Sequence, residues 1–216
     1  MPEQPARRAG PTALSGADAD ANPVDATVPD ATVPDATAEL IASLTARHLT
    51  IGVAESLTGG LLIAELIRIP GASVVVSGGI VAYDTELKRT LLGVDGGMLA
   101  VHGAVHPDVA IQMAVGVRTA VAVGGVRADI GVSTTGVAGP DAQDGQAPGV
   151  VFVGVSSENG ALAIPLQLTG DRASIRTQTV TAAIEAVRQL IAPDAWNSSR
   201  DAPVTDSTFT NKAQSS

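Results

Sequence analysis

The sequence predicts one α/β domain, folded as a three-layer α/β/α sandwich with a mixed, mostly parallel sheet. Three observations support this prediction. Helical and strand patterns alternate between residues 38 and 192, and one pair of strand patterns is joined by a short Asn-Gly turn. Hydrophobic residues make up 45% of the 216 residues but aromatic residues only 2%. A core built from Val, Ala, Leu and Ile suits strands that are covered on both faces.

The elements of this domain follow from apolar spacing and from Gly and Pro stops. The first half predicts a helical stripe over residues 40–49, a buried strand Ile51–Ala54, a helix Leu61–Ile69 that stops at Pro70-Gly71, and an extended stretch ending in Ile80–Tyr83. The second half predicts a short helix from Asp84 or Thr85 to Leu92, a long helix Asp108–Val123, a strand Asp129–Val132, a hairpin of Val150–Val155 with Ala161–Leu168, and a last helix Arg172–Ile191.

The two flanking segments have a different composition. Residues 1–37 are rich in Ala, Pro, Asp and Thr and repeat Asp-Ala-Thr-Val-Pro, and residues 193–216 are rich in Ser, Asp, Thr and Asn. Neither segment has enough large apolar surface to offset the entropy cost of ordering it. We therefore predict a disordered acidic leader at 1–37, a folded domain at 38–192 and a disordered tail at 193–216.

Charge and composition exclude several classes of protein. The net charge is −9 and no basic stripe is present, which argues against direct binding of nucleic acid. No apolar run reaches the roughly 18–20 residues that span a bilayer, and no secretory signal is present, so we expect a cytoplasmic protein. The chain has no cysteine, and its three histidines lack the spacing of a zinc site. We expect no metal and no organic cofactor.

Lys88 and Tyr83 are the only lysine and the only tyrosine between residues 38 and 192, and they lie in one short segment. Upstream, Ser56 follows an apolar strand and precedes Gly59-Gly60 and a helix. A lysine, unlike an arginine, can lose its proton when it is desolvated and serve as a general base. The residues therefore indicate serine–lysine chemistry. Plainer interpretations remain: a helix cap at Ser56 or Thr58, a solvated Lys88, and a Tyr83 that only packs.

Two further segments are candidates for ligand binding. The run Ser133–Pro140 is rich in Thr and Gly, and as a turn after a strand it would offer hydroxyl and N–H groups to a phosphate or an oxyanion. Arg172 and Arg176 open the last helix, where an arginine could bind a phosphate. An ordinary glycine turn and surface arginines fit these patterns as well.

Taken together, these motifs resemble the carboxyl-terminal domain of the competence/damage-inducible CinA family over about residues 38–192. The ordered blocks that carry the resemblance are Glu55-Ser56-x-Thr58-Gly59-Gly60, Pro70-Gly71-Ala72-Ser73, Gly78–Tyr83, Lys88, Leu91–Val94, His102–Val105, Thr135–Pro140 and Gly170-Asp171-Arg172. The enzymatic members of the family are nicotinamide-nucleotide amidases. The resemblance thus implies hydrolysis of the carboxamide of nicotinamide mononucleotide, with a small-molecule nucleotide as the partner, and we also expect a homo-oligomer.

The family's serine, tyrosine and lysine map onto Ser56, Tyr83 and Lys88 as the catalytic residues. The resemblance further implies a set of substrate-binding positions, which are Glu55, Thr58, Gly59, Gly60, Ser73, Thr135, Gly136, Gly139 and Arg172. Family members often carry a larger amino-terminal domain where this chain has its leader, so we expect the stand-alone amidase form, without any activity of that other domain.

The chain departs from the family pattern at two places. Leu57 replaces a cysteine, and Gln146–Val150 replaces a Lys-Pro-Val-Gly-Thr segment before the hairpin. The first change affects packing, and the second bears on affinity or specificity for the substrate. Two alternative functions follow: a nucleotide-binding regulatory module without turnover, or an accessory protein of competence or the DNA-damage response.

Overall fold

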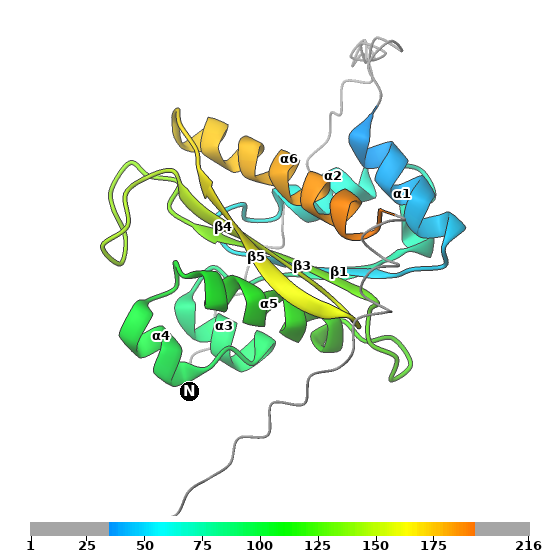
Figure 1. The fold of residues 1–216 in the computed structure, drawn as a ribbon, viewed down its shortest axis with the longest axis horizontal. Helices are drawn as coiled ribbons and strands as arrows, with labels where there is room; N and C mark the ends of the chain where they lie inside the picture. The colour runs from blue at the N-terminus through cyan, green and yellow to red at the C-terminus, as the bar shows by residue number, and fades with distance from the viewer. Residues whose placement is uncertain (1–34, 193–216) are drawn as a thin grey trace, which may run out of the picture. The chain divides into compact units, whose positions relative to one another are not determined.

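A computed structural model of the protein describes residues 35–192, which form three layers around one five-stranded sheet (Figure 1). The strands are β1 (Ile51–Glu55), β2 (Val76–Val81), β3 (Ile130–Gly136), β4 (Val150–Ser157) and β5 (Gly160–Gln167). They lie in the order β2-β1-β3-β4-β5. The β1 strand is parallel to both β2 and β3, whereas β4 is antiparallel to both β3 and β5. Only β4 thus runs against the others, which confirms the mixed, mostly parallel sheet.

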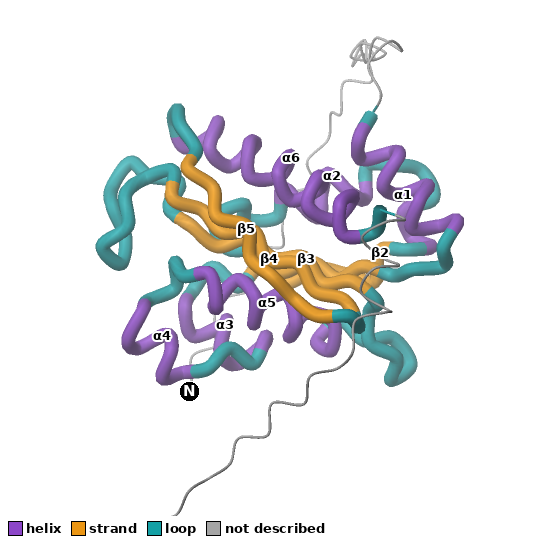
Figure 2. Tube along the Cα trace, viewed as in Figure 1, coloured by secondary structure: helices purple, strands orange, loops and turns teal. Residues whose placement is uncertain are grey.

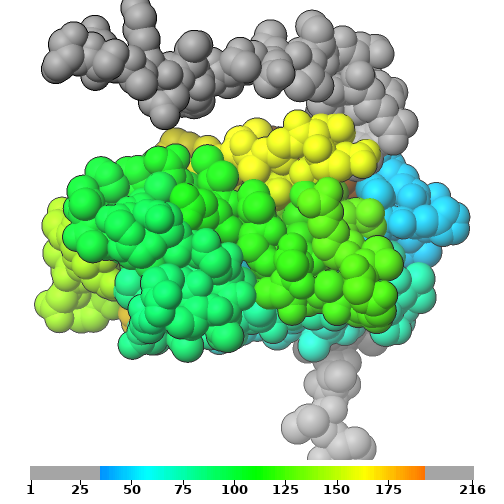
Figure 3. Space-filling view, turned by 90° about the horizontal axis from the view of Figure 1, so that it is seen from below, coloured from blue at the N-terminus to red at the C-terminus, as the bar shows by residue number. Residues whose placement is uncertain are grey.

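Three helices cover each face of the sheet (Figure 2). One layer holds α1 (Ala36–Ala46), α2 (Leu61–Ile67) and α6 (Arg172–Leu190). The other holds α3 (Thr85–Leu92), α4 (Gly96–His102) and α5 (Pro107–Ala120), which form the green face in Figure 3. Aliphatic side chains fill the space between sheet and helices on both faces, as the aromatic-poor sequence predicts.

Two glycines allow α5 to pack unusually close to its neighbours. A Cβ atom on Gly131 of β3 would lie 1.9 Å from the Ala114 carbonyl oxygen of α5. A Cβ on Gly116 of α5 would lie 1.7 Å from the Leu92 carbonyl oxygen at the end of α3. These close approaches fix α5 on the sheet and fix α3, the helix that carries Lys88, on α5.

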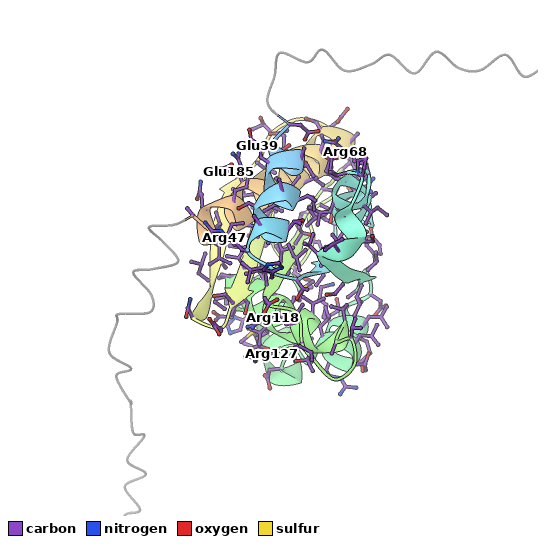
Figure 4. The ribbon with its side chains drawn as sticks, turned by 90° about the vertical axis from the view of Figure 1, so that its right-hand side faces the viewer. Glu39, Arg47, Arg68, Arg118, Arg127 and Glu185 are labelled. Atoms are coloured by element: carbon purple, nitrogen blue, oxygen red, sulfur yellow. The ribbon has the colours of Figure 1, made fainter. Side chains whose placement is uncertain are left out.

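Arg118 holds the last turn of α5 and is labelled in Figure 4. Its side chain is buried, and it donates from Nε to the Ala128 carbonyl at 2.9 Å and from Nη1 to the Ser157 carbonyl at 2.6 Å. These bonds connect α5 to the segment before β3 and to the end of β4. Arg118 is therefore a structural residue of the core.

Three parts of the secondary structure differ from the sequence prediction. The α4 helix was not predicted, because its first residues, Gly96 and Gly97, are poor helix formers; the Asp95 side chain caps it by accepting from the Met98 N–H at 2.7 Å. The β2 strand begins at Val76 and ends at Val81, two residues before the predicted end of the extended stretch at Tyr83. The β3 strand continues to Gly136, through residues that were predicted as a turn.

The α1 helix begins at Ala36, and the Asp35 carboxylate caps it by accepting from the N–H groups of Thr37 and Ala38. The rest of the predicted leader and the predicted tail lie outside the described residues. Among the helices of residues 35–192, none combines the length and the apolar character needed to cross a membrane.

Candidate active site

The candidate site lies at the carboxyl ends of the parallel strands β1 and β3, where ligands commonly bind in open α/β sheets. Ser56 follows β1 directly, and its N–H donates to the Thr134 carbonyl of β3 at 3.0 Å. The turn after Ser56 closes with a bond from the Gly59 N–H to the Ser56 carbonyl at 3.1 Å. Gly59 and Gly60 both adopt positive φ angles (58° and 95°), which glycine accepts without strain.

Glu55 is buried beneath the start of α2. Its carboxylate accepts from the N–H groups of Gly60 at 2.9 Å, Leu62 at 3.1 Å and Ile63 at 2.9 Å. These are the unpaired donors at the first turn of a helix, and a carboxylate there also interacts favourably with the helix dipole. Glu55 is 1% exposed, and its carboxylate acts as a cap at the start of α2.

Lys88 is the largest fully buried side chain, with 1% of its surface exposed. Its Nζ lies 3.0 Å from the Ser56 hydroxyl oxygen and 2.8 Å from the Ala82 carbonyl oxygen. Burial lowers the pKa of Lys88 from 10.5 to about 8, although the nearby carboxylates of Asp84 and Asp144 oppose this shift. Desolvation, which the sequence analysis named as the way a lysine loses its proton, is thus the cause of the shift, and the neighbouring charges are acidic.

Tyr83 and Arg172 come together above Ser56. The Arg172 guanidinium donates from Nη2 to the Tyr83 hydroxyl oxygen at 3.2 Å and from Nη1 to the Gly139 carbonyl at 2.8 Å. Tyr83 is 62% exposed. The amine of Lys88 is therefore oriented by the Ala82 carbonyl, one residue before Tyr83, and the phenol contacts an arginine instead of the lysine.

A pocket of about 140 Å³ joins these residues. Three segments line it: Ser56 and Leu57 after β1, Tyr83 after β2, and the loop from Gly136 through Asp141 and Gln143, with Arg172 at the rim. The loop is fixed from outside, because the Asp144 carboxylate accepts from the Ala104 N–H at 2.9 Å. The predicted residues Ser56, Tyr83, Gly136, Gly139 and Arg172 thus share one pocket.

The two predicted threonines do not reach this pocket with their hydroxyls. Thr135 lies in β3, is 1% exposed, and donates from its hydroxyl to the Ala104 carbonyl at 2.7 Å. The hydroxyls of Thr58 and Thr134 lie 2.7 Å apart and are buried. The prediction that Thr135 sits in a phosphate-binding turn is not supported, because β-branched threonines favour the strand that actually forms here.

Ser73 lies far from the pocket of its own chain. It belongs to η1 (Ala72–Val74), a 3-10 turn that precedes β2, and Val76 of β2 pairs with Ile51 at the amino end of β1. Ser56 follows the opposite end of β1, so at about 3.3 Å per strand residue the two serines are separated by roughly 16 Å or more.

Arg176 on α6 has a role that the sequence did not reveal. Its side chain is half-buried, and it donates from Nε to the Leu57 carbonyl at 3.0 Å and from Nη2 to the Thr58 carbonyl at 2.6 Å. Leu57 itself packs in a small apolar cluster with Ile175. The last helix therefore holds the turn that carries Ser56. The only sequence signal was an arginine one helical turn after Arg172.

His102 at the end of α4 and His106 before α5 lie side by side. Their rings stack with centroids 4.6 Å apart, and His106 caps α5 by accepting from the Asp108 N–H at 3.3 Å. Within residues 35–192, no group of three or more His, Cys, Asp or Glu side chains is arranged to hold a metal ion.

Comparisons with known proteins agree on one family. The family model described as "CinA C-terminal domain" matches residues 34–191. A CinA-like protein of Frankia casuarinae is 43% identical over 153 residues, which are 71% of this chain and 34% of that protein. One of Gemmatimonas aurantiaca is 41% identical over 73% of this chain and 36% of that protein. The chain thus spans about a third of the length of these relatives.

Solved structures show the same fold. The competence/damage inducible protein CihA of Agrobacterium tumefaciens is 34% identical, with a TM-score of 0.66 over 74% of this chain and 99% of that chain. A CinA superfamily protein of Klebsiella pneumoniae is 30% identical, with a TM-score of 0.67 over 72% of this chain and 94% of that chain.

Proposed function

The chain belongs to the CinA C-terminal domain family, and from this premise we propose that it hydrolyses the carboxamide of nicotinamide mononucleotide to nicotinate mononucleotide and ammonia. The observation that carries the proposal is the buried Lys88 amine 3.0 Å from the hydroxyl of Ser56, which lines the pocket. A buried lysine beside a serine that lines a pocket is the arrangement that an amide-cleaving serine needs.

Lys88 acts as the general base. With a pKa of about 8, it is neutral in about one molecule in ten at pH 7, compared with about one in 2,500 for an ordinary lysine. One N–H of the neutral amine donates to the Ala82 carbonyl, and this bond directs the lone pair toward Ser56. The Ala82 carbonyl thus orients the Lys88 amine, and burial raises the fraction of Lys88 that is neutral.

The reaction has two steps. The Ser56 oxygen attacks the carboxamide carbon while its proton passes to Lys88, which forms a tetrahedral intermediate. The C–N bond then breaks, Lys88 returns the proton to the departing nitrogen, and ammonia leaves an ester on Ser56. In the second step Lys88 takes a proton from water and the water oxygen attacks the ester carbon. The bond from that carbon to the Ser56 oxygen then breaks, Lys88 returns the proton to this oxygen, and nicotinate mononucleotide is released.

Main-chain N–H groups stabilise the oxyanion of the intermediate. The N–H groups of Gly59 and Gly60 already donate to the Ser56 carbonyl and the Glu55 carboxylate. The N–H groups of Leu57 and Thr58 have no acceptor within residues 35–192. We assign the oxyanion donors to Leu57 and Thr58. Arg176 holds the Leu57 carbonyl, which shares its peptide plane with the Thr58 N–H.

Arg172 and Tyr83 bind the substrate at the rim. Arg172 is exposed and carries the positive charge of the pocket, which suits the phosphate of a nucleotide. Its bond to the Tyr83 hydroxyl places both side chains on the same wall. Tyr83 therefore shapes the entrance of the pocket.

Ammonia release from nicotinamide mononucleotide, compared between the wild-type chain and Ser56→Ala, tests the function. Release by the wild type alone supports the amidase and its nucleophile. Equal release by both would refute Ser56 as the nucleophile. If neither releases ammonia but the nucleotide binds, the regulatory module without turnover replaces the amidase. A gel shift with DNA at low salt tests the accessory role, and the excess of acidic residues favours a negative result.

A further inference from the structure

Two side chains of opposite charge, Asp141 and Arg172, line the pocket beside Ser56. They are not paired with each other, because within residues 35–192 no ion pair or hydrogen bond engages the Asp141 carboxylate. Arg172 donates instead to the Gly139 carbonyl and to the Tyr83 hydroxyl. The amidase reaction gives Arg172 the phosphate of the substrate but leaves Asp141 without a role.

The loop that carries Asp141 is held at its base and at its tip. At the base, the Gly149 N–H donates to the Val137 carbonyl at 2.8 Å. At the tip, Asp144 has a φ angle of 51°, a left-handed conformation that is uncommon for residues other than glycine. Its carboxylate accepts from the Ala104 N–H at 2.9 Å, which ties the tip to the segment before α5. The wall that contains Asp141 is therefore built into the fold.

The size of the pocket determines which part of a nucleotide can lie against this wall. Its volume is about 140 Å³, whereas pockets that enclose a whole ligand are typically about 300–1,000 Å³. The pocket therefore encloses the part of the substrate that must reach Ser56, which is the ring with its carboxamide. In nicotinamide mononucleotide this ring is positively charged, because its nitrogen is bonded to the ribose, and the phosphate at the other end is negatively charged.

We propose that Asp141 recognises the positive charge of the nicotinamide ring, an inference that rests on the proposed function and names what the site selects. The unpaired carboxylate attracts a cationic ring while Arg172 binds the phosphate, so the two charges of the pocket match the two charges of the substrate. The carboxylates of Asp84 and Asp144, which act on Lys88, add to the negative potential around the ring. An aromatic amide with an uncharged ring is then a poorer ligand.

Binding to the Ser56→Ala protein, measured by titration calorimetry, tests the proposal without any turnover. The two probes are nicotinamide mononucleotide and its reduced form, whose ring is uncharged but whose carboxamide, ribose and phosphate are the same. Ser56→Ala should bind the cationic form more tightly. Adding Asp141→Asn should lower this preference about threefold to fivefold, as expected for the loss of one partly solvated charge pair. Since Asp141 is exposed and makes no contact of its own, circular dichroism should not change.

Two further variants serve as controls in the same Ser56→Ala background. Asp141→Glu keeps the charge and should keep most of the preference. Glu185→Gln removes a carboxylate near the other end of α6 from Arg172 and should leave the preference unchanged. An unchanged preference in Asp141→Asn, or an equal loss of affinity for both probes, would overturn recognition of the ring charge, and so would a failure to bind either probe. A wild type that binds the cationic form selectively but releases no ammonia would refute the amidase and leave this inference standing.

Discussion

The Arg176 guanidinium donates to the Thr58 carbonyl at 2.6 Å, although 118 residues of chain separate them. Arg176 donates a second hydrogen bond to the Leu57 carbonyl at 3.0 Å, so it holds the turn that follows Ser56 at two points. The position of Ser56 therefore depends on α6 as well as on β1. The bond to the Leu57 carbonyl also fixes the peptide plane that carries the Thr58 N–H, one of the two groups proposed to hold the oxyanion.

Arg176→Gln should lower kcat by about 100-fold, because a small displacement of the nucleophile and its oxyanion donors costs that much in rate. KM should change little, since Arg176 does not line the pocket. Steady-state kinetics separate the two parameters. Arg188→Gln, which removes an arginine from the exposed side of the same helix, is the control and should behave like the wild type. A rise in KM alone would contradict the positioning role.

The activity should follow the protonation of Lys88. Since the base must be neutral, kcat/KM should rise about tenfold per pH unit below pH 8 and level off above about pH 9. A pH–rate profile from pH 6.5 to 10 checks this. Lys88→Arg should show no such rise and should lose activity by about a factor of 100 or more, because a guanidinium keeps its proton.

Asp84→Asn should move that profile to lower pH. The Asp84 carboxylate opposes the fall in the pKa of Lys88, so its neutralisation lets the pKa fall further. Asparagine still caps α3, because its side-chain oxygen can accept from the Glu86 N–H as the carboxylate does at 2.8 Å. The kinetic pKa is the measurement. A midpoint that moves upward would show that Lys88 is not the titrating base.

Lys88 should also make the stability depend on pH. The folded chain has a pKa of about 8 at this site and the unfolded chain about 10.5, so between these values the unfolded state holds a proton that the folded state has lost. Stability therefore rises with pH across this window. Relative to Lys88→Met, the wild type should gain about 3 kcal/mol from pH 7 to pH 10.5.

Urea unfolding of both proteins at these two pH values measures that gain, and subtracting one from the other cancels all other titrating groups. Methionine is the matched replacement because it is unbranched and of similar length. An unchanged difference between the two proteins would mean that Lys88 keeps its proton in the folded state.

Arg172→Ala should weaken the preference for the nucleotide over the corresponding nucleoside. A charge-assisted bond to a phosphate contributes about 1.5–3 kcal/mol, so KM for the mononucleotide should rise about tenfold or more while the value for the riboside changes little. Arg172→Lys keeps the charge and should recover part of the loss. Equal effects on both substrates would place the phosphate elsewhere.

The sequence predicted the fold and the pairing of Ser56 with Lys88, because apolar spacing determines the layers and a lone buried lysine is conspicuous. The sequence prediction failed where the local structural preference of a residue conflicts with the contacts that the residue makes in the fold. Thr135 and Gly136 were predicted as part of a turn, but they continue β3 and pair with β4. Gly96 and Gly97 are poor helix formers, so the helix that begins with them, α4, was not predicted. Arg176 binds carbonyls that lie 118 and 119 residues away in the sequence, and local patterns carry no information about such contacts.

The place of Glu55 has a consequence for the chemistry of its neighbour. A carboxylate directly beside Ser56 would ordinarily compete for the lysine, form an ion pair and keep the amine protonated. Here the Glu55 carboxylate accepts hydrogen bonds from three N–H groups at the start of α2, and Glu55 is not among the groups that perturb the pKa of Lys88. The start of α2 thus keeps the Glu55 carboxylate from pairing with the Lys88 amine, although Glu55 directly precedes Ser56. The amine of Lys88 can therefore be neutral in spite of this nearby carboxylate.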